Sequence, residues 1–161
     1  MAETFENAVK TCPPLAEHYC PGMNALSQAY KQKIVVKSNT TVTGSINMDA
    51  ALGATHPNDS RWDYGIGYRS RTGALERNDS VCWVEIHPAS SPHNAVEVLT
   101  KLAFHRQWLT NNAPKLASLK REFVWVATGK VAIPPHHRHR RLMATEGLKL
   151  QGQVHQLGKE N

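Results

Sequence analysis

Residues 81–109 have the sequence VCWVEIHPASSPHNAVEVLTKLAFHRQWL, in which a strand pattern is followed at once by a helix pattern. Alternating residues of the first part fall on opposite faces of a strand, so Glu85 and His87 share one face. Pro88 ends the strand, and serines followed by a proline are typical of a helix start. Apolar residues then recur at helical spacing, which predicts a helix over 92–109.

Further strand patterns lie on both sides of this stretch. Residues 42–48 and 62–68 alternate in character with a period of two, as expected for half-buried strands. Residues 123–127 form a continuous apolar run, which is typical of a central strand covered on both faces. Residues 148–154 show a weaker strand pattern. The polar and glycine-containing residues 70–80 predict a loop.

Helical patterns complete the order of elements. Residues 3–33 are predicted to be helical with proline interruptions, and 134–147 to form a basic helix. The resulting order is helix, three strands, helix, strand, helix, strand. This order predicts an α/β fold with a central mixed sheet of about four or five strands flanked by helices. We expect one domain, 1–161, with three parts: a helical N-terminal segment (1–33), a sheet with its crossover helix (40–128), and a basic helix with the last strand (134–157).

Composition excludes several classes of protein. With 161 residues, 40% hydrophobic and 20% charged, the chain has the make-up of a folded globular domain. It contains no apolar run of the length that a membrane helix needs, and the acidic start MAETFE does not have the form of an export signal. Three cysteines without a Cys-x-x-Cys pair agree with a cytoplasmic location. The net charge of +6 favours a polyanion as partner and gives no reason to expect a membrane.

Two acidic residues stand on neighbouring predicted strands. Asp63 lies in RWDY on the second strand, and Glu85 lies in WVEIH on the third, just before the crossover helix. This arrangement resembles the restriction-endonuclease-like nucleases of the PD-(D/E)XK superfamily, which share a helix–three strands–helix–strand core. Those nucleases carry an Asp on the second strand and a Glu-x-Lys on the third. The resemblance covers most of the chain, from about residue 24 to residue 127, although the motif itself is short.

The resemblance implies a metal-dependent nuclease. Asp63 and Glu85 would bind Mg²⁺ or Mn²⁺, with the backbone carbonyl between Glu85 and His87 as a further oxygen ligand. The cation would activate water and neutralise charge on a phosphodiester. The implied substrate or partner is nucleic acid, with DNA as the first expectation. The implied catalytic residues are Asp63, Glu85, His87 and Lys101.

The sequence departs from the superfamily at the lysine of the motif, where it has His87. Histidine is only partly charged near neutral pH, whereas lysine is a fixed positive charge. Some members of the superfamily take the basic group from the following helix, where Lys101 lies. The alternative for Lys101 is an ordinary ion pair with Glu97, four residues earlier on the same helix. His87 could be a base, a metal ligand or a remnant.

The acidic residues have structural alternatives too. Asp63 could pair with Arg61 or cap a turn. Glu85 lies within an apolar run, where a carboxylate is costly to bury without a bonded partner. Asp49, near the end of the first predicted strand, could be a third acidic group or simply a turn residue.

The basic segment HHRHRR at 136–141 contains the candidate nucleic-acid-binding residues Arg138, Arg140 and Arg141. Arginines near phosphate release condensed counterions and so strengthen binding. Consecutive helical positions point in different directions, so only part of this segment could contact one ligand. A solvated helix face is the alternative. The sequence thus predicts a possible or degenerate nuclease; the alternative function is a non-catalytic nucleic-acid-binding or protein-interaction domain.

Overall fold

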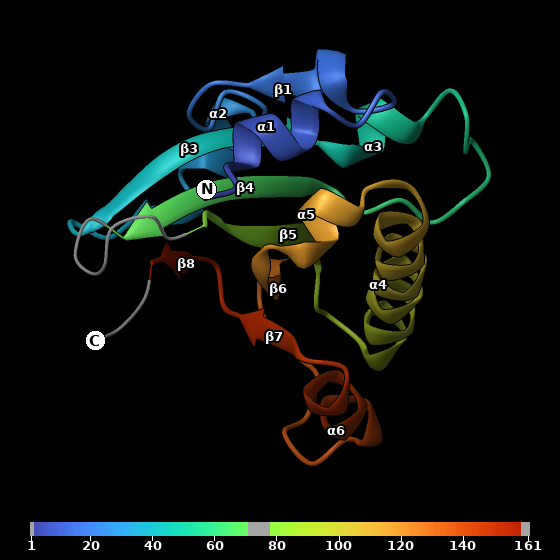
Figure 1. The fold of residues 1–161 in the computed structure, drawn as a ribbon. Helices are drawn as coiled ribbons and strands as arrows, with labels where there is room; N and C mark the ends of the chain where they lie inside the picture. Colours follow the sequence, from blue (N-terminus) through green and yellow to red (C-terminus); the bar gives the residue numbers. More distant parts are fainter. Residues whose placement is uncertain (1, 71–77, 159–161) are drawn as a thin grey trace.

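The computed structural model describes residues 2–70 and 78–158, and its centre is a mixed six-stranded sheet (Figure 1). The strands of this sheet, in spatial order, are β1 (Tyr19–Cys20), β3 (Thr40–Asn47), β4 (Tyr64–Ser70), β5 (Ser80–Pro88), β6 (Lys120–Thr128) and β7 (Leu148–Gln151). The predicted α/β class is confirmed, with six strands in place of four or five. Most of the predicted loop 70–80 lies outside the described residues.

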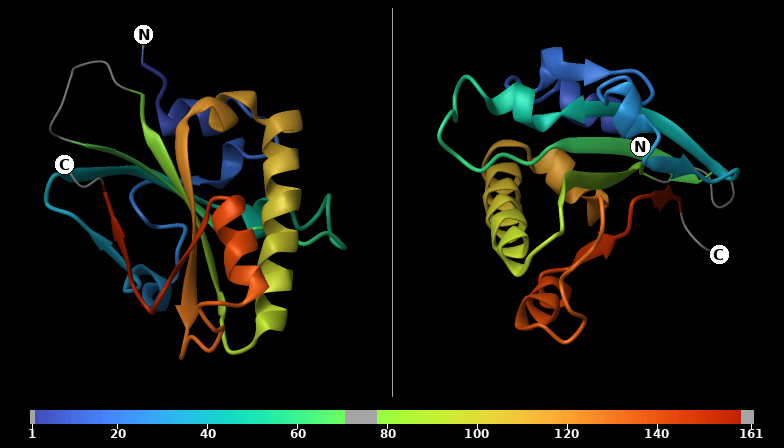
Figure 2. Two further views of the ribbon diagram at one scale, coloured as in Figure 1. Left: turned by 90° about the horizontal axis from the view of Figure 1, so that it is seen from below. Right: turned by 180° about the vertical axis from the view of Figure 1, so that it is seen from behind.

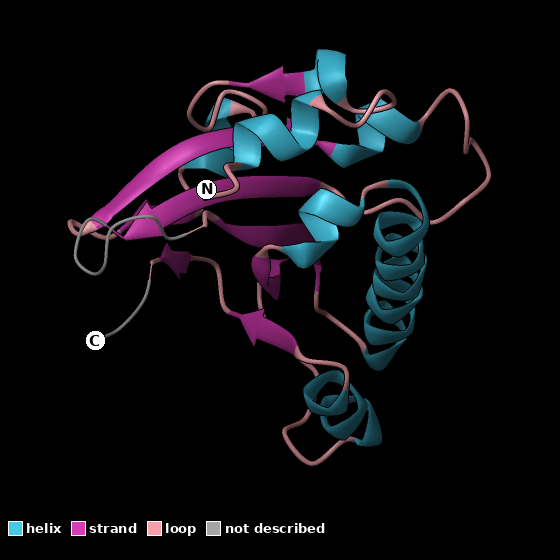
Figure 3. Ribbon diagram, in the orientation of Figure 1, coloured by secondary structure: helices cyan, strands magenta, loops and turns pink. Residues whose placement is uncertain are grey.

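The helices connect and cover these strands, as Figure 3 shows by colour. They are α1 (Phe5–Lys10), a 3₁₀ turn (Ala16–His18), α2 (Gln28–Lys31), α3 (Met48–Leu52), α4 (Pro92–Asn112), α5 (Pro114–Ser118) and α6 (Arg138–Thr145). None of the helices in the described part of the chain combines the length and the apolar character needed to span a bilayer.

Strands β3, β4 and β5 form an antiparallel meander, as predicted, and β5 then pairs in parallel with β6. A parallel pair needs a crossover, which α4 and α5 provide. Strand β7 continues the parallel pairing beyond β6 after the chain has passed through α6. The predicted crossover helix is therefore present, and it is extended at its end to Asn112.

The two faces of the sheet are covered by different elements (Figure 2). Helices α4, α5 and α6 lie on one side, where Trp83 and Trp125 belong to a core that also includes α1. On the other side Val84 and Val126 pack with a smaller parallel sheet of β2 (Ile34–Val36) and β8 (His155–Leu157). Strand β6 contributes to both cores, which confirms the predicted central position of its apolar run.

Several element predictions were wrong at the two ends of the chain. The predicted helix ending at 33 is reduced to α2, and β1 and β2 occupy residues expected to be helical or irregular. Pro13-Pro14 and Pro21-Gly22 interrupt any continuous helix in this region. Strand pairing with distant segments therefore decides its structure. The predicted last strand, 148–154, is shorter in the structure, where β7 ends at Gln151. The chain then bends and joins the second sheet as β8.

Two glycines of β4 make room for large side chains on the sheet. A Cβ atom added at Gly65 would overlap the Trp83 ring, and one at Gly67 would overlap the Phe5 side chain. Since both rings are fully buried, they can lie this low only over glycine. The Gly-x-Gly pattern of this strand therefore has a packing role on the α4 face.

Candidate active site

Asp63 and Glu85 lie beside each other where β4 begins and β5 approaches its end. Asp63 directly precedes β4, and Glu85 lies in β5, one residue beyond the pairing of Tyr64 with Val84. The backbone N–H of Asp63 donates to Glu85 Oε1 at 3.1 Å, and the N–H of Ile86 donates to Asp63 Oδ2 at 2.9 Å. Each carboxylate thus accepts a main-chain hydrogen bond from the other strand. The two side chains are fixed side by side.

Lys101 reaches both carboxylates from the middle of α4. Its Nζ forms an ion pair with Glu85 Oε2 and lies 3.8 Å from Asp63 Oδ1. Glu85 is completely buried, whereas the side chains of Asp63 and Lys101 are about one-fifth exposed, at 21% and 22%. The expected ion pair between Lys101 and Glu97 is not formed among the described residues. Two carboxylate oxygens therefore converge on one cation, the Lys101 ammonium.

The electrostatics of this cluster follow from burial of three charges together. Burial, followed by the negative charge of Asp63, raises the pKa of Glu85 to about 8 although Lys101 opposes the change. Burial also raises the pKa of Asp63, again against Lys101. For Lys101 burial favours the neutral amine, but the two carboxylates outweigh it and raise the pKa. The cluster near neutral pH therefore holds a charged lysine and one extra proton on its carboxyl groups.

His87, which the sequence resemblance aligned with the motif lysine, lies on the edge of the cluster. Its Nδ1 is 3.7 Å from Glu85 Oε2, and its Nε2 is 3.2 Å from Glu97 Oε1. Glu97 also accepts a hydrogen bond from Asn94 Nδ2 at 2.9 Å. The imidazole consequently connects the buried carboxylate of β5 with an exposed carboxylate of α4. Sequence reasoning assigned Glu97 to Lys101 and missed this contact.

Asp49 and Arg61 form a separate pair at the rim of the cluster. Arg61 Nε donates to Asp49 Oδ1 at 2.9 Å, and Arg61 Nη1 donates to the His56 carbonyl at 2.7 Å. Arg61 thus pairs with Asp49, and the alternative pairing with Asp63 is not found in the described structure. Asp49 lies in the first turn of α3, beyond the end of β3, which corrects its predicted place on a strand.

The three candidate arginines of α6 differ in their surroundings. Arg138 and Arg141 are exposed. Arg140 donates from Nε and Nη2 to the Ile133 carbonyl, at 3.2 and 2.9 Å, and so holds the loop before the helix. The predicted helix start at Pro134 was too early, because α6 begins at Arg138. Of the three, Arg138 and Arg141 are therefore the exposed ones, while Arg140 is half-buried and bonded to the main chain.

His105 was not singled out from the sequence, and it lies about one helical turn beyond Lys101 on α4. Its ring stacks on Trp62 at a centroid distance of 5.7 Å and contacts Trp83 edge-on at 4.3 Å. Complete burial lowers its pKa to about 3, so the imidazole is neutral. The spacing of Glu97, Lys101 and His105 by four residues was the available signal, since it places all three on one face of the helix.

Comparison of the chain with protein-family models, curated proteins and solved structures gives no match. The chemistry of the site is therefore inferred from its geometry. Asp63 Oδ1 and Glu85 Oε2 are the two oxygens that could bind a divalent cation. A pair of carboxylates suits Mg²⁺ or Mn²⁺, because Mg²⁺ usually keeps several waters and binds only one or two protein carboxylates.

Proposed function

We propose that this chain is a metal-dependent nuclease domain of the restriction-endonuclease-like kind, with Asp63 and Glu85 as ligands of Mg²⁺ or Mn²⁺. The observation that carries the proposal is the convergence of the two carboxylates and Lys101 at the end of the β4–β5 hairpin. The order of elements supports it, since a three-stranded meander is followed by a crossover helix and a parallel strand. In this interpretation Lys101 replaces the lysine that the superfamily has at the position of His87.

The roles of the protein groups follow from their positions. A bound divalent ion would supply the positive charge that polarises a phosphodiester and favours ionisation of water. Asp63 Oδ1 and Glu85 Oε2 would hold it, and Glu85 would give up its proton to do so. Lys101 would then leave the place between the two oxygens and become the cation that orients a phosphate or a water. His87, with Nδ1 3.7 Å from Glu85 Oε2, would be a group that could accept a proton.

A second function is favoured by a different observation. Both carboxylates already accept backbone hydrogen bonds, and Lys101 already supplies their counter-charge. The charges of such a cluster are balanced without a metal ion. This is what we expect of a domain that has kept the fold and lost catalysis. The net charge of +6 would then serve non-catalytic binding of nucleic acid.

Cleavage assays distinguish the two functions. Single- and double-stranded DNA and RNA would be incubated with the protein and Mg²⁺, Mn²⁺ or a chelator. We expect metal-dependent cleavage that falls at least about 100-fold in Asp63→Asn and Glu85→Gln. Asp59→Asn is the matched control, because Asp59 is exposed and pairs with His56 away from the cluster. Absence of cleavage of all four substrates, with folded protein, would contradict the nuclease and leave the binding domain.

The source of the basic group is tested by a rescue experiment. Lys101→Met should abolish cleavage if the ammonium acts in the reaction. Adding His87→Lys to that variant restores a lysine at the superfamily position on β5, and we expect partial recovery of activity. If His87→Lys alone lowers activity and gives no recovery in the double variant, the imidazole has a role that a lysine cannot fill.

A further inference from the structure

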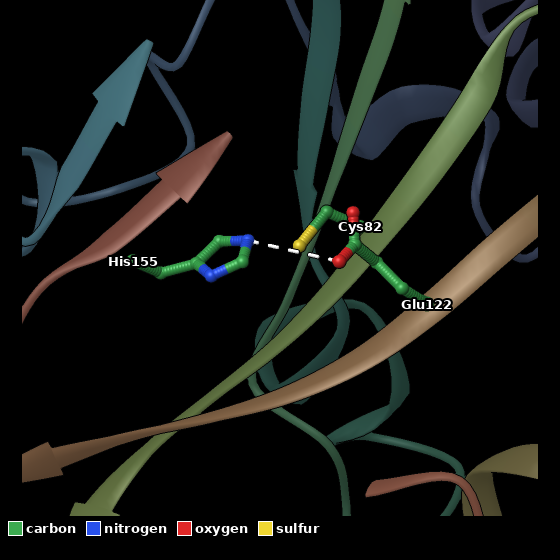
Figure 4. Close-up of side chains that lie close together, drawn as sticks. All are labelled: Cys82, Glu122 and His155. Carbon is green, nitrogen blue, oxygen red and sulfur yellow. Dashed lines mark ion pairs between the residues drawn. The ribbon is translucent and has the colours of Figure 1, made fainter. Parts of the chain in front are cut away.

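A second cluster of polar side chains lies on the opposite face of the sheet from Asp63 and Glu85. Its members are Cys82 of β5, Glu122 of β6 and His155 of β8 (Figure 4). Cys82 and Glu122 are paired in the parallel β5–β6 register, and β8 brings His155 over them from the second sheet. The sulphur, one carboxylate oxygen and one imidazole nitrogen all lie within 4.8 Å of one another.

His155 has an unsatisfied nitrogen in this cluster. The residue is 6% exposed, and its buried Nε2 has no hydrogen-bond partner among the described residues. The nearest acceptor, Glu122 Oε1, is 3.8 Å away, which is too long for a hydrogen bond. An unpartnered buried polar atom is costly, so native proteins usually satisfy it with a protein group, a water or an ion.

Glu122 is oriented toward the imidazole by its other contacts. Tyr68 donates its hydroxyl to Glu122 Oε2 at 2.9 Å, and this leaves Oε1 facing His155. Lys149 Nζ lies 3.7 Å from Glu122 Oε1, but its side chain is 61% exposed and can turn away into solvent. Hydrogen bonds of this kind, from a neighbouring group to a ligating carboxylate, fix its orientation in metal sites.

The protonation states of the cluster also suit a metal ion. Burial lowers the pKa of His155, although Glu122 opposes this, so the imidazole is neutral near pH 7 as a ligand must be. Burial and the charge of Glu122 raise the pKa of Cys82, so the thiol is protonated without a metal. Binding would therefore release about one proton, from Cys82 Sγ to the solvent.

We infer that Cys82, Glu122 and His155 form a Zn²⁺ site that nothing in the proposed nuclease chemistry requires. Thiolate, imidazole and carboxylate together are ligands that favour Zn²⁺ over Mg²⁺. Tetrahedral Zn²⁺, with bonds of about 2.0–2.3 Å, separates its ligand atoms by roughly 3.3–3.7 Å. The distance from His155 Nε2 to Glu122 Oε1 is already 3.8 Å, and distances of up to 4.8 Å within the cluster would need to contract by roughly 1.1–1.5 Å to reach those values.

The fourth position would be filled from solvent. Glu122 and His155 line a cavity of about 660 Å³ that also has Lys37, Arg121 and Lys149 in its wall. Three protein ligands and one exchangeable ligand are the pattern of open zinc sites, and the basic wall favours an anion or hydroxide there. The ion would also join β8 to the central sheet, so its removal should loosen the C-terminal strand.

Titration of the metal-free 161-residue chain with Zn²⁺ and Co²⁺ tests the inference. We expect one tightly bound ion at this cluster, release of about one proton at pH 7, and a sulphur-to-cobalt charge-transfer band. Cys82→Ser should remove the band, and His155→Gln should weaken binding at least about tenfold. Cys20→Ser is the matched control, because Cys20 lies outside the cluster, and Asp63→Asn removes the other candidate cation site.

Each other outcome contradicts the inference. Absence of stoichiometric binding, persistence of the band in Cys82→Ser, or its loss in Cys20→Ser would show that this cluster holds no metal. If Cys82→Ser does not fold, His155→Gln decides, since unchanged Zn²⁺ affinity in that variant overturns the site. Loss of Zn²⁺ binding in Asp63→Asn alone would assign the ion to the nuclease-like cluster.

Discussion

Strand β5 contributes to two polar clusters of different character, one on each face of the sheet. Glu85 points toward α4, where oxygen ligands and an ammonium satisfy one another through short contacts. Cys82, three residues earlier, points toward β8, where sulphur, nitrogen and oxygen approach closely but leave His155 unpartnered. In the first cluster Lys101 supplies the counter-charge of the carboxyl groups. In the second, His155 Nε2 has no hydrogen-bond partner among the described residues. Closely spaced residues of one strand can thus support a hard-cation site and a soft-metal site.

The largest expected difference between the two faces of the sheet is the change in the free energy of unfolding when a lysine is removed. Lys101→Met leaves the Asp63–Glu85 pair, which carries one negative charge near neutral pH, without its counter-charge, and we expect a loss of about 3 kcal/mol in the free energy of unfolding. Lys149→Met on the other face removes an exposed cation near Glu122, where about 0–1 kcal/mol is expected. Chemical denaturation measures both. Equal effects would contradict the view that Lys101 stabilises the first cluster.

A smaller effect concerns pH. The pKa of Glu85 is raised from 4.5 to about 8, so between those values the folded chain holds a proton that the unfolded chain has lost. The stability contributed by this proton is present below pH 4.5 and is lost as pH rises toward 8. The contribution of Glu85 to the free energy of unfolding should fall by up to about 1.4 kcal/mol per pH unit in this window. Below pH 6.5 buried His105 contributes an opposite change, because the unfolded chain binds a proton that the folded imidazole does not, so the net fall is expected above pH 6.5.

Denaturation measured between pH 6.5 and pH 8, where His105 no longer opposes the Glu85 contribution, tests that sign. Glu85→Gln should flatten the curve because the titrating group is gone. Glu122→Gln is the matched control on the other face, and it should keep the fall. Stability that stays constant across the window, with no difference between the unmodified protein and Glu85→Gln in slope, would mean that Glu85 is ionised throughout, with Lys101 as a permanent ion-pair partner.

The smallest effect concerns binding of nucleic acid. Arg138→Ala and Arg141→Ala should each lower the salt dependence of duplex DNA binding by about 0.9 in the logarithmic slope. Lys149→Ala, on the other face, should leave the slope unchanged. Arg140→Ala should instead lower stability, because Arg140 holds the Ile133 carbonyl. If Lys149→Ala lowers the salt slope and the α6 substitutions leave it unchanged, nucleic acid binds on the face of the cavity that Lys149 lines and not at α6.

Local pattern predicted the middle of the chain well. The strand at 81–87 and the helix from Pro92 were visible because alternation, a proline stop and a capping serine all agree there. The ends were predicted poorly, since β1, β2 and β8 are short and form only by pairing with distant residues. Alternation over 62–68 favours one face for Trp62 and Tyr64, but Trp62 precedes β4 and packs into the opposite core.

The two clusters also differed in how far the sequence could predict them. Proximity of Asp63 and Glu85 was predictable because neighbouring strands of a meander bring them together. The partner of Lys101 was not, because a helix pattern alone favours Glu97 and gives no information about which strand residue lies beneath. His155 could not be associated with Cys82 from sequence, since β8 leaves the central sheet and reaches the cluster through a second one.

The most direct test of the proposed metal site at Asp63, Glu85 and Lys101 is a crystal structure of the protein soaked in Mn²⁺, with anomalous scattering recorded at the manganese edge. We expect one anomalous peak between Asp63 Oδ1 and Glu85 Oε2, with Lys101 Nζ moved out of that position. Absence of anomalous density there, with Lys101 still bonded to both carboxylates at saturating Mn²⁺, would contradict this expectation. The cluster would then be a structural ion-pair network without a metal.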